Sequence, residues 1–116
     1  MKKFSLIVLI NLIWSVEVFA GTLINTRWII TPLPLETTNR PYEIMFLFND
    51  KCKYKKAHHK NYENDVTCIW KYIDKELHYT INDYSFTKAK VIRNVIKGDS
   101  FNLDDKKWKI VGEKLK

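Results

Sequence analysis

Short segments of alternating apolar and polar residues fill this sequence, and residues that favour turns separate them about every ten positions. Alternation with a period of two places side chains on opposite faces of a β-strand, and helical spacing of apolar residues is rare here. The pattern predicts an all-β protein built as an antiparallel up-and-down meander of about eight strands. We expect the meander to form a small barrel or a strongly curled sheet, because closure removes exposed strand edges.

The turns predict which residues face each other, since a slip of one residue would reverse every face. We expect two-residue turns at Asp74-Lys75, Asn82-Asp83 and Arg93-Asn94, and a four-residue loop over 104–107. Apolar parity changes between Phe86 and Ala89, which predicts a bulge or bend there. The predicted facing pairs are Tyr72 with Leu77, Trp70 with Tyr79, Cys68 with Ile81, Ile81 with Tyr84, Tyr79 with Phe86, Val91 with Ile96, Ala89 with Gly98, Leu103 with Trp108, and Phe101 with Ile110.

Two further strands are expected upstream. The first surrounds Trp28, and the second, "YEIMFLFN", places Tyr42, Ile44, Phe46 and Phe48 on one face. Three prolines bracket the segment between them. We predict a loop over 31–40, because proline cannot donate a hydrogen bond within a central strand.

The N-terminus has the three parts of a secretory signal peptide. Lys2 and Lys3 precede an apolar run over 4–16, and the small residues Val18 and Ala20 follow where a signal peptidase expects them. The alternative, an N-terminal amphipathic helix of a cytosolic protein, is disfavoured because the run is apolar on all sides. Since a bilayer span needs about 20 apolar residues, we expect no transmembrane segment. The prediction is a signal peptide over 1–20 and one domain over 21–116, exported to the periplasm or the medium.

The segment "CKYKKAHHKNYENDVTC" holds both cysteines and two of the three histidines. If Cys52 and Cys68 face each other on neighbouring strands, Tyr54 faces Val66, and a turn over 49–51 sets Phe48 against Cys52. Such a cross-strand pair lies about 4.5–5.5 Å apart between Cα atoms, within reach of a disulfide. Export favours oxidation, so we predict a Cys52–Cys68 disulfide. A zinc site of these cysteines with His58 and His59 is the weaker alternative, because adjacent histidine side chains diverge. We predict no metal and no cofactor.

The cationic loop between the cysteines is the most distinctive exposed segment, and loops on a rigid scaffold often bind partners. The residues we single out for partner binding are Lys55, Lys56, His58, His59, Lys60 and Tyr62. The alternative is an ordinary solvated hairpin end. The formal net charge of +7 falls to +6 without residues 1–20, and its lysines are scattered, so we expect a mildly cationic surface and no nucleic acid partner.

Several features resemble the small exported lipocalin-like and avidin-like meander β-barrels of bacteria. They are Thr26-Arg27-Trp28 in the first strand, Gly98 in "IKGDSFN", and a final strand "WKIVGEK" led by Trp108. The resemblance implies a barrel that can hold one small apolar ligand among its inner aromatic residues. The candidate ligand-lining residues are Trp28, Phe46, Trp70, Tyr79 and Trp108.

Known catalytic motifs are missing from the sequence. It contains no Gly-x-Ser-x-Gly elbow and no phosphate-binding glycine loop, so we predict no enzyme and no catalytic residues. A small hydrolase, for instance one cleaving RNA with His58, His59 or His78 and Lys71 or Lys56, is the least favoured hypothesis. The main hypothesis is a monomeric, exported, non-catalytic protein that binds a partner protein, such as a hydrolase or toxin that it blocks. The second is a carrier of a small apolar ligand.

Overall fold

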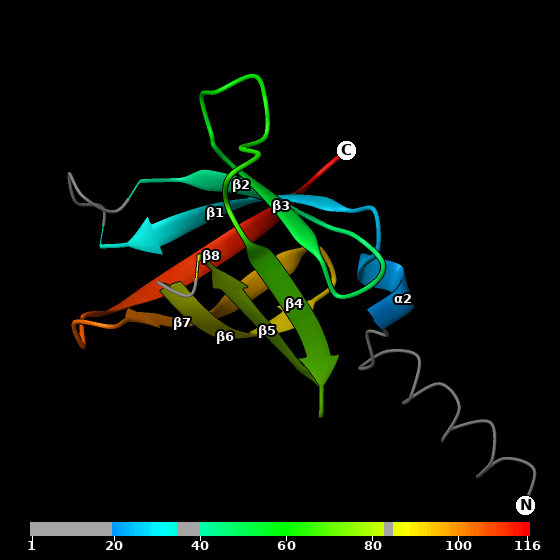
Figure 1. Ribbon diagram of the computed structural model, residues 1–116. Coiled ribbons are helices and arrows are strands. Elements are labelled where there is room, and N and C mark those ends of the chain that lie inside the picture. The colour runs from blue at the N-terminus through cyan, green and yellow to red at the C-terminus, as the bar shows by residue number, and fades with distance from the viewer. Residues whose placement is uncertain (1–19, 35–39, 83–84) are drawn as a thin grey trace, which may run out of the picture.

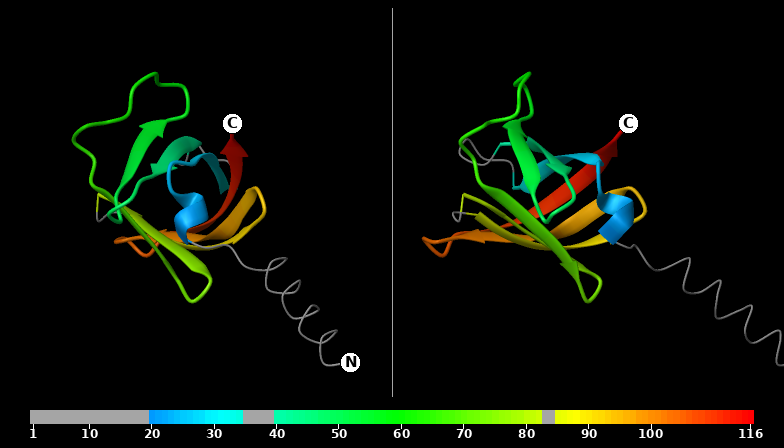
Figure 2. Two further views of the ribbon diagram at one scale, coloured as in Figure 1. Left: turned by 90° about the vertical axis from the view of Figure 1, so that its right-hand side faces the viewer. Right: turned by 45° about the vertical axis from the view of Figure 1, so that its right-hand side comes forward.

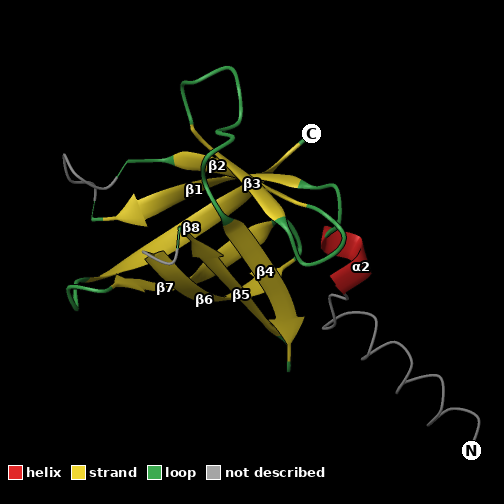
Figure 3. Cartoon of the chain, in the orientation of Figure 1, coloured by secondary structure: helices red, strands yellow, loops and turns green. Residues whose placement is uncertain are grey.

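The computed structural model describes residues 20–34, 40–82 and 85–116. Their eight antiparallel strands form one sheet in the order β3-β2-β1-β8-β7-β6-β5-β4, preceded by a short helix, α2 (Figures 1 and 3). The sheet curls until its two edge strands approach each other, giving a nearly closed barrel (Figure 2). This confirms the predicted all-β up-and-down fold. The elements are α2 (Ala20–Leu23), β1 (Arg27–Leu33), β2 (Tyr42–Phe46), β3 (Cys52–Lys56), β4 (Cys68–Ile73), β5 (Glu76–Ile81), β6 (Ser85–Ile92), β7 (Val95–Asn102) and β8 (Lys107–Leu115). The predicted signal peptide lies almost wholly outside the described residues.

The barrel closes between β3 and β4, the two edges of the sheet. The predicted disulfide joins Cys52 to Cys68 across this seam, with 4.9 Å between their Cα atoms. Besides the disulfide, an isolated bridge pairs Lys51 with Ile69, and the Trp70 backbone N–H donates to the Asp50 carbonyl over 3.0 Å. The seam is therefore short, and a covalent bond holds much of it.

The pairing predicted beyond the cysteines is wrong. Tyr54 does not face Val66, because β3 ends at Lys56 and β4 begins only at Cys68. The Tyr54 carbonyl instead accepts from the Glu63 backbone N–H over 2.9 Å. On the other side of β3, the turn is longer than predicted, so Phe46 rather than Phe48 pairs with Cys52.

Alternate residues of each strand point into the barrel and form the core. Trp28, Ile30, Ile44, Phe46, Leu77, Tyr79, Ile96 and Ile110 are each at most 1% exposed. The helix α2 lies across one end of the barrel, and its Leu23 is buried against this core (Figure 2). Trp28 Nε1 donates to Thr26 Oγ1 over 2.8 Å, and Trp70 Nε1 donates to the Leu47 carbonyl over 2.8 Å. The buried indoles thus have the polar partners that they need.

Two of the predicted hairpins have the expected register. In the first, Trp70 pairs with Tyr79, and Asp74 and Lys75 both have positive φ, as a two-residue hairpin turn of type I′ requires. In the second, Arg93-Asn94 sets Val91 against Ile96 and Ala89 against Gly98. The predicted facing pairs of both hairpins are confirmed.

The register predicted for β5 and β6 is wrong, and so is the bulge in β6. Ile81 pairs with Ser85 and Tyr79 with Thr87, and β6 then pairs without interruption along its length. Asp83 and Tyr84, which the predicted turn and pairing include, lie outside the described residues. The prediction placed the aromatic Phe86 inside the barrel. In the structure Thr87 and Ser100 face inward, and their hydroxyls share a hydrogen bond of 2.6 Å. Phe86 instead faces outward.

The register predicted for β7 and β8 is also wrong. Ser100 pairs with Trp108 and Gly98 with Ile110, so the loop covers 103–106. Asn102 organises this loop, since its Oδ1 accepts from the backbone N–H groups of Asp104 and Lys106 over 2.9 and 3.1 Å. Phe101 therefore points outward and stacks on Phe86, with 5.3 Å between ring centroids.

The loop predicted over 31–40 begins later than expected. Strand β1 continues through Pro32 to Leu33, and Pro32 pairs with Ile110 of β8. On its other side β1 pairs with β2 only as far as Ile30. Among the described residues, β1 has one partner beyond Ile30, and proline is tolerated in such an edge position.

Candidate functional site

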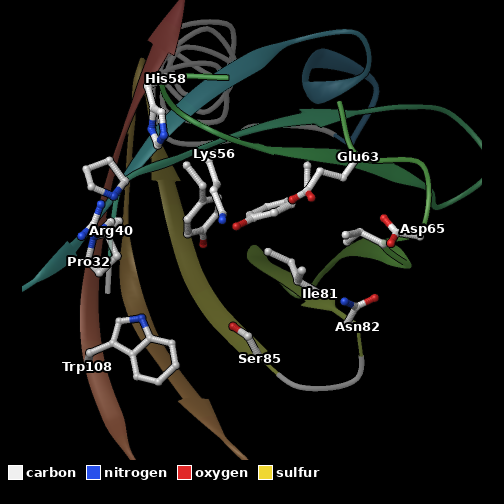
Figure 4. A pocket seen from close by; sticks show the side chains of 14 residues that line it. Pro32, Arg40, Lys56, His58, Glu63, Asp65, Ile81, Asn82, Ser85 and Trp108 are labelled. Atoms are coloured by element: carbon white, nitrogen blue, oxygen red, sulfur yellow. The ribbon is translucent and has the colours of Figure 1, made fainter. Parts of the chain in front are cut away.

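A pocket of about 680 Å³ lies at the end of the barrel opposite α2 (Figure 4). We call it the mouth pocket. Strand ends and the loops that join them surround it, so residues distant in sequence meet there. Its lining residues are Pro32, Arg40, Pro41, Tyr42, Tyr54, Lys56, His58, Glu63, Asp65, Val66, Ile81, Asn82, Ser85 and Trp108.

Two tyrosines separate the mouth pocket from the core of the barrel. The hydroxyl of Tyr42, which lines the pocket, lies 2.7 Å from that of buried Tyr79. Burial raises the pKa of Tyr79 to about 12 and raises the pKa of Tyr42 well above its ordinary value. Both phenols are therefore neutral at ordinary pH. Behind them Phe46 packs against Tyr79 and Trp70, with ring centroids 6.1 and 5.0 Å apart, and fills the interior.

Only one of the aromatic residues predicted to line a ligand lies at the pocket. Trp108 is part of its wall, whereas Trp28, Phe46, Trp70 and Tyr79 pack in the core. The four core side chains are at most 4% exposed and contact one another or other core residues. The mouth pocket therefore lies at the end of the core rather than between the core side chains.

The loop between β3 and β4 (57–67) is anchored by a buried carboxylate. Glu43 faces outward from β2, yet it is only 4% exposed because the loop covers it. Its carboxylate accepts a hydrogen bond from the Tyr62 hydroxyl and lies 3.6 Å from both Arg27 Nη1 and Lys55 Nζ. Lys55 Nζ also donates to the His59 carbonyl over 2.7 Å. A buried charge requires such partners, so these contacts fix the loop on the barrel.

The anchoring also changes the ionisation of the tyrosine. The pKa of Tyr62 is raised to about 12, first by burial and then by the hydrogen bond and charge of Glu43. Lys53 and Lys55 place their ammonium groups 5.9 and 5.7 Å from the Tyr62 ring centroid. Tyr62 is thus neutral and partly buried, and its hydrogen bond to Glu43 links the loop to β2.

The structure divides the six predicted loop residues into three groups. Lys56 and His58 line the mouth pocket. Lys55 and Tyr62 contact Glu43. His59 and Lys60 are exposed. The sequence interpretation did not single out Arg40, Tyr54, Glu63 and Asp65 of the pocket wall, since nothing local in the sequence brings them to the same strand ends.

The charges of the mouth pocket lie on opposite sides. Figure 4 shows Arg40, Lys56 and His58 on one wall, and the carboxylates of Glu63 and Asp65 on the other. Apolar and aromatic groups also line the pocket, among them Ile81, Tyr54 and Trp108. The pocket is therefore electrically polarised across its width.

No group of three or more His, Cys, Asp or Glu side chains among residues 20–34, 40–82 and 85–116 could hold a metal ion. Both cysteines are in the disulfide. No helix in the described part of the chain is both long enough and apolar enough to cross a membrane.

Comparisons with known proteins do not add an identity. No family model, no curated protein and no solved structure matches this chain. The similarity to lipocalin-like and avidin-like barrels therefore stays a prediction from the sequence pattern.

Proposed function

We propose that this chain is an exported, non-catalytic binding protein that holds a protruding segment of a partner protein in the mouth pocket. The observation that supports this most is the pocket itself. It is a hollow of about 680 Å³ whose walls come from six strands and from the loop that Glu43 anchors. A rigid scaffold that presents loop residues around a hollow is a common arrangement for binding.

The filled interior favours a surface partner over a carried small molecule. Pockets that hold a drug-sized ligand bury about 70–90% of its surface. Here Tyr42 and Tyr79 close the hollow toward the core, and Trp28, Phe46 and Trp70 fill the space where an apolar ligand was expected. A protruding segment of a partner protein can bind at the open end of the mouth pocket without entering the core.

The test is a quantitative pull-down from the envelope fraction of the host, with wild-type protein and three variants. We expect one protein to be enriched by the wild type and lost with Lys56→Glu and with Tyr54→Ala. Lys71→Glu is the matched control, because Lys71 is exposed on β4 and does not line the pocket. The enriched protein is then purified and its affinity measured. Equal affinity for the wild type and both pocket variants would exclude the mouth pocket as the binding site.

A second measurement addresses the carrier hypothesis directly. Native mass spectrometry of protein purified from the host should give the mass of the chain alone. A retained small apolar molecule would instead support a carrier and count against the proposal.

A further inference from the structure

We infer that the segment entering the mouth pocket presents an acidic and a basic side chain on either side of an apolar one. This inference rests on the proposed function and names the chemistry of its partner. The evidence is that the pocket has Lys56 on one side and the carboxylates of Glu63 and Asp65 on the other. A segment with both charges complements both sides, whereas a singly charged or wholly apolar segment does not.

The cationic wall comes from two elements that the fold brings together. Lys56 is the last residue of β3 and His58 follows it in the loop, while Arg40 precedes β2. The pairing of Lys56 with Tyr42 holds the β2 and β3 ends side by side. Of these groups, Lys56 is placed to pair with an acidic side chain of the partner.

The acidic wall comes from the returning arm of the loop. The backbone N–H of Glu63 donates to the Tyr54 carbonyl, which ties this arm to β3, and Asp65 follows two residues later. The Glu63 carboxylate is near enough to the Tyr54 phenol to add to the effect of burial in raising its pKa. The two carboxylates are placed to accept a basic side chain.

Lys56 is not neutralised by the acidic wall. Within the described residues, no ion pair joins Lys56 or His58 to Glu63 or Asp65. Opposite charges kept apart in one pocket are available to a partner, and complementary charges specify its orientation. The ring of Trp108 and the side chain of Ile81, which line the same pocket, offer a surface for the apolar residue.

The experiment uses capped tripeptides as probes of the folded full-length protein. Asp-Phe-Lys and Lys-Phe-Asp carry both charges in the two orders, Asp-Phe-Gln and Asn-Phe-Lys carry one charge, and Asn-Phe-Gln carries none. Binding is followed by the indole N–H signals in a nitrogen–proton correlation spectrum. Trp108 lines the pocket, whereas the buried Trp28 and Trp70 serve as references in the same spectrum.

We expect one of the doubly charged peptides to shift the Trp108 signal at a concentration about fivefold lower than either singly charged peptide. With Lys56→Gln, an acidic residue in the peptide should no longer strengthen binding. With Glu63→Gln, a basic residue in the peptide should no longer strengthen it. The spectrum of each variant also reports whether it is folded. Equal binding of the neutral and charged peptides, or charge effects that neither variant alters, would overturn the inference.

Two further outcomes separate this inference from the proposed function. If a partner protein depends on Lys56 and Tyr54 in the pull-down but the peptides show no charge preference, the proposed function stands and the inference fails. If free phenylalanine, a small zwitterion, binds more tightly than every peptide, the occupant is a small molecule rather than a protein segment, and both fail.

Discussion

Removal of the Cys52–Cys68 disulfide tests how the barrel is closed. The variant Cys52→Ala/Cys68→Ala leaves β3 and β4 with only the Lys51–Ile69 bridge and a few hydrogen bonds across the seam. The disulfide spans 16 residues of sequence. A loop of this size corresponds to about 3 kcal/mol of stabilisation, because the cross-link limits the unfolded chain.

The expected loss is large for a domain of this size. A small domain is stable by only about 5–15 kcal/mol, so a loss of about 3 kcal/mol removes a substantial part of that stability. For a domain of fewer than about 100 residues, each 1 kcal/mol corresponds to about 4–8 °C in Tm. The variant should therefore melt about 12–24 °C below the wild type.

Urea unfolding followed by tryptophan fluorescence measures this loss. Trp70 reports on the seam because it follows Cys68 closely and packs on Phe46. The unfolded variant is less constrained than the oxidised wild type, so the dependence of the free energy on urea should become steeper. Reduced wild-type protein is the control and should lose the same stability. A loss below about 1 kcal/mol in both samples would refute the argument that the disulfide holds the seam.

Three further predictions concern other parts of the molecule. Glu43→Gln should lower the free energy of unfolding by about 1–3 kcal/mol and speed tryptic cleavage within 57–67, since the anchor of the loop loses its charge; unchanged cleavage would contradict this. Gly98→Ala should destabilise by about 1–3 kcal/mol in urea unfolding, because the added Cβ would lie 2.3 Å from a backbone oxygen of β6. Gly21→Ala, with nothing within 4 Å, is its neutral control, and equal effects would be a refutation. Stability should fall as pH rises from 10.0 to about 12, because Tyr62 and Tyr79 keep protons in the folded protein that the unfolded chain loses. Urea midpoints that stay constant over this range would show otherwise.

The sequence predicted the fold class well because most strands obey the alternation rule. It also predicted the register at Asp74-Lys75 and Arg93-Asn94, where the inner-face residues next to a two-residue turn are apolar. The cysteine pair was predictable for the same reason, since Cys52 and Cys68 continue the inner faces of their strands.

The wrong registers of β5 with β6 and of β7 with β8 share one physical cause. Thr87 and Ser100 face inward and satisfy each other, while Phe86 and Phe101 face outward and stack. An interpretation that places every aromatic residue inside therefore shifts both hairpins. Hydrogen bonding between two inner polar residues depends on the register itself, so it cannot be used to find the register from the sequence.

The candidate site was only partly predictable. The cationic residues between the cysteines stood out by composition, and Lys56 and His58 do line the mouth pocket. The sequence did not indicate that Lys55 and Tyr62 would turn toward a buried carboxylate of β2. Nor did it bring Arg40 to the same pocket, because that proximity depends on how the whole sheet curls.

The pairing of β1 with β8 has a consequence for the order of folding. Arg27 pairs with Leu115, so the first strand of the barrel finds one of its two neighbours only in the eighth strand. Contacts that span nearly the whole chain form slowly, because a long loop must close before they are gained. The barrel therefore cannot close before β8 has been synthesised.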